Sequence, residues 1–210
     1  FTSTIFVSNV GHGNKNVCNA VKKVLEKPLI HSYAYVNEER VQYHKKLVEF
    51  AGTPFEKAFL LSAGTEATEA ALKLMRMNGQ KNKINKLGII CIEGNWHGRT
   101  LGAQMMSGNS SQKEWIGYHD PNIHHIRFPY PWALNGKTGE EFLELELQKL
   151  QKSGIDLGKD ICGVMLETFQ GWGAVFYPSE FQFNLIFPMG KLIQFEYHLL
   201  KQTLYQLYHP

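Results

Sequence analysis

Three segments of the sequence combine glycine with polar or aromatic residues that could hold a small ligand: SAGTEA (62–67), EGNWHGRT (93–100) and ETFQGWG (167–173). In the first, Gly64 allows a ligand to approach the backbone closely. The free N–H groups at the start of the following helix, together with the Thr65 hydroxyl, can bind a phosphate. The same residues also suit an ordinary strand-to-helix turn in which Thr65 is the N-cap, and SAGTEA taken alone favours that turn.

The second segment, EGNWHGRT, offers three different functional groups. Trp96 has a flat π-face, His97 has a ring nitrogen, and the Arg99 guanidinium matches a carboxylate. Each residue alone is better explained structurally, as a core tryptophan, a hydrogen-bonded loop histidine and an arginine in a surface ion pair. Together at the end of a strand they indicate an aromatic platform beside an anion receptor.

The third segment places Glu167 and Gln170 just beyond a buried strand. A carboxylate in that position needs a partner or a path to solvent. Glu167 is therefore either a capping or salt-bridged residue or, with Gln170, part of a polar floor for a heteroaromatic cofactor. The sequence contains neither GxGxxG nor GxxxxGK[ST], so pyridoxal phosphate suits these segments better than a nucleotide.

Alternating strands and helices must position these segments. Continuous apolar runs predict buried strands at 58–62, 87–92 and 161–166. Apolar residues at helical spacing predict helices over 17–26, 38–50 and 140–154.

A further helix is predicted to follow Gly64 and to stop at Asn78-Gly79. It has a polar stripe (Glu66, Glu69, Lys73 and Arg76) and an apolar face (Ala67, Ala70, Ala71, Leu74 and Met75). This order of elements predicts an α/β fold with a mostly parallel sheet flanked by helices. In such sheets ligands bind at the carboxyl ends of the strands, where the three segments fall.

Composition excludes several classes of function. The 210 residues are 43% hydrophobic and 20% charged, as in a soluble globular protein. The net charge of +3 comes without a basic block, so we expect neither a nucleic-acid nor a membrane partner. The three cysteines are widely spaced and form no CxxC pair, which predicts buried thiols, a cytoplasmic location and no metal site.

Residues 1 to about 180 resemble the class III (ω-amino acid) aminotransferases, the family that includes 4-aminobutyrate, ornithine and acetylornithine aminotransferases. The resemblance is carried, in the family's order, by IFVSNVGHGNKNV, HSYAYVNEERVQYHKKL, LLSAGTEATEAALKLMR, NWHGRTLGA and LETFQGWGAVFYP. It implies a fold type I enzyme in which pyridoxal 5'-phosphate serves the transfer of an amino group from an amino acid to a 2-oxo acid. It also implies a site shared across a homodimer. An aminomutase or a racemase is compatible with the same motifs.

The resemblance implies a role for each matching residue. Gly64 and Thr65 would bind the cofactor phosphate, and Trp96, where Phe or Tyr is usual, would stack on the pyridine ring beside His97. The Arg99 guanidinium would hold a substrate carboxylate. The remaining matches are Glu167 and Gln170, the first Glu and the Gln of an EPxQGE motif close behind the cofactor, and Ile5, which would line the substrate pocket.

The sequence departs from the family in two places. Trp172 stands where the motif has its second Glu. The family's Asp that pairs with the pyridine nitrogen and its Schiff-base Lys come later along the chain, but no Asp follows Asp160 here, and Lys191 and Lys201 lie in unrelated contexts. We therefore assign no catalytic residue, and we expect the chain on its own to be inactive.

These departures define the predicted organisation. Residues 1–50 are predicted to form an N-terminal helical segment and 51–180 a portion of the large cofactor-binding domain. Residues 181–210 are predicted to form a divergent tail unlike the native family structure, after a frameshift or a break in the gene. The chain opens on FTSTIFVSN without a methionine, so we also expect residues to precede it. Two alternatives stay open, a non-catalytic pyridoxal-phosphate-binding or interaction protein and a chain without a stable fold.

Overall fold

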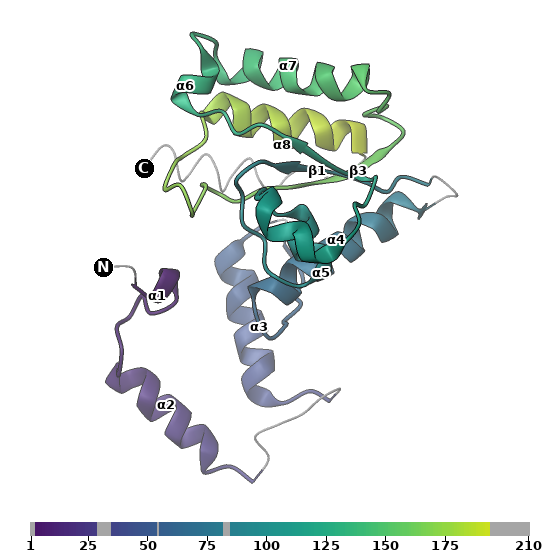
Figure 1. The fold of residues 1–210 in the computed structure, drawn as a ribbon. Coiled ribbons are helices and arrows are strands. Elements are labelled where there is room, and N and C mark those ends of the chain that lie inside the picture. The colour runs from purple at the N-terminus through teal and green to yellow at the C-terminus, as the bar shows by residue number, and fades with distance from the viewer. Residues whose placement is uncertain (1–2, 29–34, 54, 82–84, 194–210) are drawn as a thin grey trace. The chain divides into compact units, whose positions relative to one another are not determined.

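A computed structural model describes residues 3–28, 35–53, 55–81 and 85–193. The chain divides into two compact units, residues 1–58 and 59–210, and each is considered by itself. In chain order (Figure 1) the elements are α1 (Ser3–Phe6), α2 (Lys15–Leu25), α3 (Glu38–Ala51), α4 (Gly64–Gly79), β1 (Gly88–Ile92), α5 (Leu101–Met106), the 3₁₀ helix η2 (Ser110–Ile116), β2 (Ile123–Ile126), α6 (Pro131–Leu134), α7 (Gly139–Lys152), β3 (Ile161–Met165) and α8 (Ser179–Ile193).

The N-terminal unit consists of short helices with side-chain caps. The helices predicted over 17–26 and 38–50 are found as α2 and α3. The side-chain oxygen of Asn14 accepts hydrogen bonds from the backbone of the first turn of α2, and Asn37 does the same for α3. No described residue of this unit is buried. Part of the HSYAYVNEERVQYHKKL motif, His31–Ala34, lies outside the described residues.

The second unit contains a parallel sheet with the strand order β2-β1-β3. In the central strand, Ile90 pairs with His124 of β2 on one side and with Val164 of β3 on the other. The strands predicted at 87–92 and 161–166 are thus confirmed, as is the α/β fold with a parallel sheet flanked by helices. The sequence analysis missed β2, whose four residues include two histidines.

The strand predicted at 58–62 is wrong, because the described structure has no strand between α3 and β1. Phe59 is 75% exposed and Leu61 is 39% exposed, so this apolar run is not buried either. A parallel strand requires a neighbour that pairs with its backbone N–H and C=O groups. Both edges of β1 are already occupied by β2 and β3, and residues 58–62 do not pair with the outer edge of either strand.

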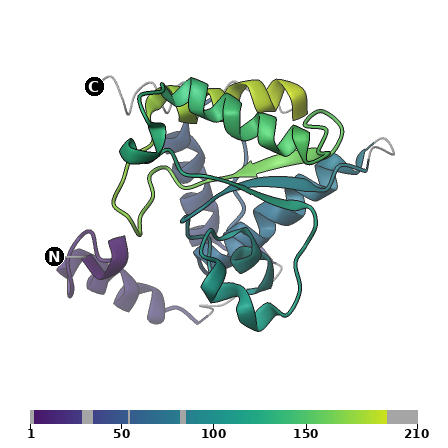
Figure 2. The same cartoon turned by 45° about the horizontal axis from the view of Figure 1, so that its top comes forward.

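Two layers of helices cover the sheet, with α7 and α8 on one face and α4 and α5 on the other (Figures 1 and 2). All of β1 is buried, and its side chains alternate between the two faces. The α7–α8 layer is built on Ile90 and Ile92, with Phe128, Phe142, Leu143, Phe181 and Leu185 among its members. The α4–α5 layer contains Ile89, Cys91, Met75, Met106 and Cys162.

Helix α8 crosses the position where the composition changes. Phe181 and Leu185 are fully buried in the α7–α8 layer, so the described chain stays packed beyond residue 180. The change in composition at residue 181 therefore does not mark the end of the folded core. Residues 194–210 of the predicted tail lie outside the described residues, and the tail's divergent origin stays a prediction.

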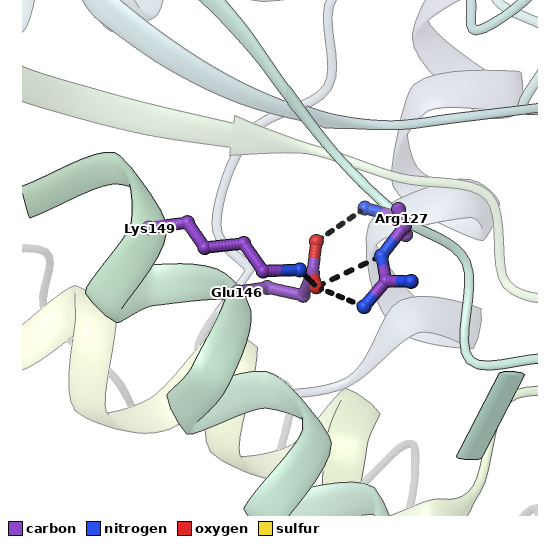
Figure 3. Close-up of polar contacts among 3 residues, drawn as sticks. All are labelled: Arg127, Glu146 and Lys149. Carbon is purple, nitrogen blue, oxygen red and sulfur yellow. Dashed lines mark hydrogen bonds and ion pairs between the residues drawn. The ribbon is translucent and has the colours of Figure 1, made fainter. Parts of the chain in front are cut away.

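An ion-pair network ties the end of β2 to α7. The Arg127 guanidinium donates to Glu146 Oε1 from Nε at 3.0 Å and from Nη2 at 2.7 Å, and the Lys149 ammonium donates to the same oxygen at 2.5 Å (Figure 3). The backbone N–H of Arg127 donates to the other carboxylate oxygen. The Glu146 side chain is only 4% exposed, so these bonds replace the water that it loses on folding.

The three thiols differ in burial, which predicts their reactivity. Cys18 is exposed, whereas Cys91 and Cys162 are buried. Burial raises the pKa of both buried thiols, that of Cys162 to about 11, which keeps them protonated and unreactive. We expect a thiol reagent at pH 8 to modify one cysteine rapidly in the native chain and all three in denaturant. Rapid modification of Cys91 without denaturant would contradict the described core.

Candidate functional site

The three glycine-containing segments lie close together, two at the carboxyl ends of β1 and β3 and one at the N-terminus of α4. Gly98 lies so close to Thr65 that a methyl group added at Gly98 would be 2.4 Å from the Thr65 hydroxyl oxygen. Gly94 lies equally close to Gln170, since a methyl group there would be 2.5 Å from Nε2. EGNWHGRT and ETFQGWG follow β1 and β3 and meet at one edge of the sheet, as expected for parallel strands. SAGTEA joins them at the N-terminus of α4, without the strand that was predicted to precede it.

The N-terminus of α4 has no side-chain cap. Ala63 is the N-cap residue and makes no side-chain hydrogen bond, and Thr65 is the second residue of the helix. The interpretation of Thr65 as an N-cap is therefore wrong. The Ser62 backbone N–H donates to Glu66 at 2.9 Å, but the space beside Gly64 is open. The first N–H groups of a 16-residue helix thus face an open position with a partial positive charge.

Glu167 fastens the EGNWHGRT loop to the ETFQGWG loop. One carboxylate oxygen accepts from the backbone N–H of Trp96 at 3.0 Å, and the other accepts from that of Gly171 at 3.3 Å. Burial raises the pKa of Glu167, and these two hydrogen bonds oppose that rise. Within the described chain Glu167 is neither salt-bridged nor a helix cap, and it holds the backbone of Trp96 to that of Gly171. Its predicted place close behind the cofactor stays a prediction.

The Gln170 side chain also forms hydrogen bonds that hold the loops of the site together. Its side-chain oxygen accepts from the Tyr130 hydroxyl at 2.6 Å, and its Nε2 donates to the backbone oxygen of Glu93 at 3.1 Å. Its backbone also pairs with Val175 in an isolated antiparallel bridge. The Gln170 side chain is only 1% exposed, so it is a buried link between the Glu93 backbone and Tyr130. Its predicted contact with the cofactor stays a prediction.

His97 is buried beneath the site. Its backbone N–H donates to Ser107 Oγ, and its backbone oxygen accepts from Thr68, so the loop is held against α4 and α5. Burial, with smaller contributions from His125 and Lys113, lowers the pKa of His97 to about 4. The ring is therefore neutral at physiological pH, and its Nε2 has no hydrogen-bond partner in the described part of the protein. The backbone contacts of His97 hold the loop, and its predicted place beside the cofactor ring stays a prediction.

The two residues predicted to contact substrate belong to different units of the chain. Arg99 is exposed just before α5, and its guanidinium makes no ion pair with any residue that the structure describes. The alternative that Arg99 forms a surface ion pair is therefore unsupported. Ile5 belongs to the N-terminal unit, where its side chain is 80% exposed and its backbone is left-handed with φ of 54°. Its assignment stays a prediction.

Sequence reasoning missed one wall of the site. A cavity of about 350 Å³ lies beside Trp96 and Trp172, and its other walls come from Glu93–Asn95, Ser107–Ser110, Gln112 and Tyr130. The 107–110 turn contacts the loop closely, because the Gly108 backbone N–H donates to the Asn95 oxygen at 2.7 Å. The only hint in the sequence was the composition of SGNSS, which is typical of a turn.

The described residues fit a phosphorylated heteroaromatic cofactor. The uncapped N-terminus of α4 and the Thr65 hydroxyl suit a phosphate, since both offer donors. Gly98 allows the EGNWHGRT loop to pack directly against Thr65, since a side chain at this position would clash with it. The indole of Trp96, 38% exposed and fixed through its own backbone by Glu167, offers a flat face. The site can therefore bind an anion and a planar ring on adjacent loops.

Comparison with solved structures shows which fold this is. The taurine:2-oxoglutarate aminotransferase of Bifidobacterium kashiwanohense, solved with pyridoxal phosphate and glutamate, superposes with a TM-score of 0.78 at 22% identity. The superposition covers 91% of this chain and 43% of that one. The fold is therefore that of a portion of a transaminase.

The sequence profile of the class-III aminotransferases matches residues 1–186, and the chain belongs to this family. Members of the family depend on pyridoxal phosphate. The mitochondrial acetylornithine aminotransferase of Saccharomyces cerevisiae is 35% identical over 84% of this chain, and the putrescine aminotransferase of Pectobacterium atrosepticum is 29% identical over 83%. The chain spans 39% and 34% of these relatives' lengths. No helix in the described ranges is long and apolar enough to cross a membrane.

Proposed function

We propose that the protein represented by this chain transfers an amino group from an amino acid to a 2-oxo acid with pyridoxal phosphate. We further propose that the described residues supply the phosphate and ring portions of its site. The observation that carries the proposal is the uncapped N-terminus of α4, packed through Thr65 against Gly98 of the loop that presents Trp96. Membership of the class-III family supports the same reaction.

Each residue has a defined part in this proposal. The N–H groups of Gly64 and Thr65, with the Thr65 hydroxyl, bind the phosphate, and the indole of Trp96 covers one face of the ring. Glu167 keeps that indole in place through its backbone, while Arg99 attracts the substrate carboxylate. The bound cofactor supplies an electron-withdrawing ring that stabilises negative charge on the substrate carbon.

The assembly and the substrates belong to the same proposal. A homodimer is supported by the N-terminal unit, in which α2 exposes Val17, Val21 and Leu25 along one side. The names of the relatives suggest acetylornithine or a diamine as the amino donor. The three free thiols suit a reducing compartment such as the cytoplasm. Lys191 and Lys201 do not lie in the sequence context of the family's Schiff-base lysine, so we propose that these 210 residues alone bind the cofactor without turnover.

Substitution of Gly64 by alanine separates cofactor binding from folding. The added methyl group meets nothing within 4 Å, so the fold should be unchanged. It would occupy the space that a phosphate needs, and we expect the affinity for pyridoxal phosphate to fall about tenfold or more. Thr65→Val, which removes a hydroxyl donor to a charged group, should weaken binding by roughly 10- to 100-fold. Titration followed by cofactor absorbance measures both effects.

The matched control lies at the start of another helix. Lys15→Ala changes the first residue of α2, whose N-terminus is capped by Asn14, and it should leave cofactor affinity unchanged. Thermal unfolding of each variant checks that the fold persists. Equal affinity in wild type, Gly64→Ala and Thr65→Val would show that the α4 N-terminus does not hold the phosphate. Borohydride treatment should leave no cofactor-labelled lysine in this chain.

A further inference from the structure

The charge of the cavity beside Trp172 restricts what it can hold. Among the described residues that line it, Glu93 is the one with an ionised side chain, and no lysine, arginine or histidine lines it. The cavity wall therefore carries a net negative charge. An anionic ligand would be repelled by that carboxylate without gaining a cationic partner.

The carboxylate of Glu93 is not neutralised by a neighbour. Within the described ranges its side chain makes no ion pair. The hydrogen bond to Glu146 is the main cause of the raised pKa of Arg127, and the charge of Glu93 contributes to it as well. However, the Arg127 guanidinium donates two hydrogen bonds to Glu146 and forms its ion pair there. Glu93 is exposed, and its backbone groups are bonded to Ile126 and Gln170, which fixes where the side chain starts.

Aromatic rings form much of the remaining wall. The indoles of Trp96 and Trp172 are parallel to within 13°, with their centroids 6.4 Å apart, and both line the cavity. Tyr130 adds a third ring, held by its hydroxyl on Gln170. Trp172 is 79% exposed, so most of its surface is available to a ligand.

An organic cation satisfies both features at once. A positive charge within about 6 Å of an indole face is attracted by the ring quadrupole, and tryptophan is the best such partner. The same charge pairs with Glu93, whereas an uncharged apolar ligand would remove water from that carboxylate without replacing it. A cavity of about 350 Å³ has room for a small alkylammonium group.

We propose that Trp172, Trp96 and Glu93 form a binding site for an alkylammonium group, such as the distal ammonium of an amino donor. Trp172 stands where the resemblance to class III aminotransferases places a carboxylate, so this chain presents an indole face at that position. The function of the site in amino transfer rests on the proposed activity. The binding itself does not, and it is measured without pyridoxal phosphate.

The experiment titrates the wild-type chain with n-butylammonium, n-butanol and butyrate at equal concentrations. Binding is followed by tryptophan fluorescence and by ligand-observed NMR. We expect saturable binding of the cation and at least tenfold weaker binding of the alcohol and the carboxylate. The affinity for the cation should fall as ionic strength rises, because Glu93 is exposed.

Two variants and their controls complete the test. Trp172→Ala and Glu93→Gln should each weaken cation binding by roughly 3- to 10-fold. Phe176→Ala and Glu114→Gln remove an exposed ring and an exposed carboxylate outside the cavity, so they should have no effect. Equal binding of butylammonium and butanol, or wild-type affinity in both cavity variants, would overturn the proposal. If the wild-type chain binds the cation but does not bind pyridoxal phosphate, only the proposed function is contradicted.

Discussion

Lowering the pH from 7 to 4.5 is expected to destabilise the second unit by several kcal/mol, because the unfolded chain takes up protons on His97 and His125 that the folded chain does not. Burial is the main cause that lowers the pKa of both His97 and His125 to about 4. The ordinary value is 6.5, so between pH 6.5 and 4 the unfolded chain binds more protons than the folded chain. Stability is therefore lost as the pH falls through this window, by on the order of 3 kcal/mol per histidine when complete.

Urea denaturation at pH 7, 6 and 5 measures this effect. His97→Asn and His125→Gln keep a hydrogen-bonding side chain but remove the titrating ring, so each should reduce the pH dependence. Part of it should remain in both variants, because burial also lowers the pKa of His124. His119→Gln is the matched control, because His119 is exposed and its replacement should not change the slope. A free energy of unfolding that is constant from pH 7 to 5 would show that the folded chain does not keep the two rings neutral.

Removing both cations from Glu146 is expected to cost roughly 3–5 kcal/mol of unfolding free energy at pH 7, since it leaves a buried carboxylate without a partner. The double variant Arg127→Met with Lys149→Met keeps the aliphatic packing of both side chains. The change would be measured by denaturant unfolding. Glu146→Gln in the same background should restore most of the loss, because an amide costs less to bury than a charge.

The pH dependence of this second effect follows from the sign of the pKa shift. Burial raises the pKa of Glu146, but the hydrogen bonds from Arg127 and Lys149 outweigh burial and hold the pKa below 4.5. The network therefore contributes stability above pH 4.5 and loses it as the pH falls through the folded-state pKa, where the double variant should approach wild type. Lys159→Met breaks the exposed pair with Asp156 and should cost less than about 1 kcal/mol. If Lys159→Met lowered the unfolding free energy as much as the double variant does, burial of Glu146 would not be the cause of the larger cost.

The elements that sequence reasoning found are those with a local signal. Continuous apolar runs identified β1 and β3, and α7 was recognisable from its apolar spacing and its glycine stop. The strand β2 was missed because His124 and His125 interrupt its apolar pattern, although His125 is held there by the backbone oxygens of Met106 and Ser107. Those partners lie in α5 and just after it, so no local pattern in β2 reveals them.

The polar stripe of α4 shows the same limit. Glu69 and Arg76 were expected on a solvent-facing stripe, but Glu69 accepts from the backbone of Ala103 at 2.9 Å and Arg76 pairs with Asp120 at 2.7 Å. Leu74, expected on the apolar face, is 59% exposed. Charged residues can face inward when distant partners satisfy them, and helical periodicity carries no information about those partners.

The sequence predicted that the three segments would lie together, but it did not predict the hydrogen bonds between them. Three strand-end segments were expected to converge, and Gly98 does lie against Thr65. The sequence could not show that Glu167 would bond to the backbone of Trp96, since only the folded sheet brings residues 71 positions apart together. It also gave no signal that Tyr130 would reach Gln170 from the chain after β2.

The absence of buried side chains among the described residues of the N-terminal unit has a consequence for mass action. A helix as short as the 11-residue α2 is marginal in water on its own, so its order depends on whatever covers its apolar side. If a second subunit provides that cover, the free energy that orders α2 includes a term in protein concentration. The second unit has its own two-layered core, so its stability is intramolecular. The second unit, which carries the candidate site, would then be stable at any protein concentration. The helix α2 would become ordered only at concentrations at which the subunits associate.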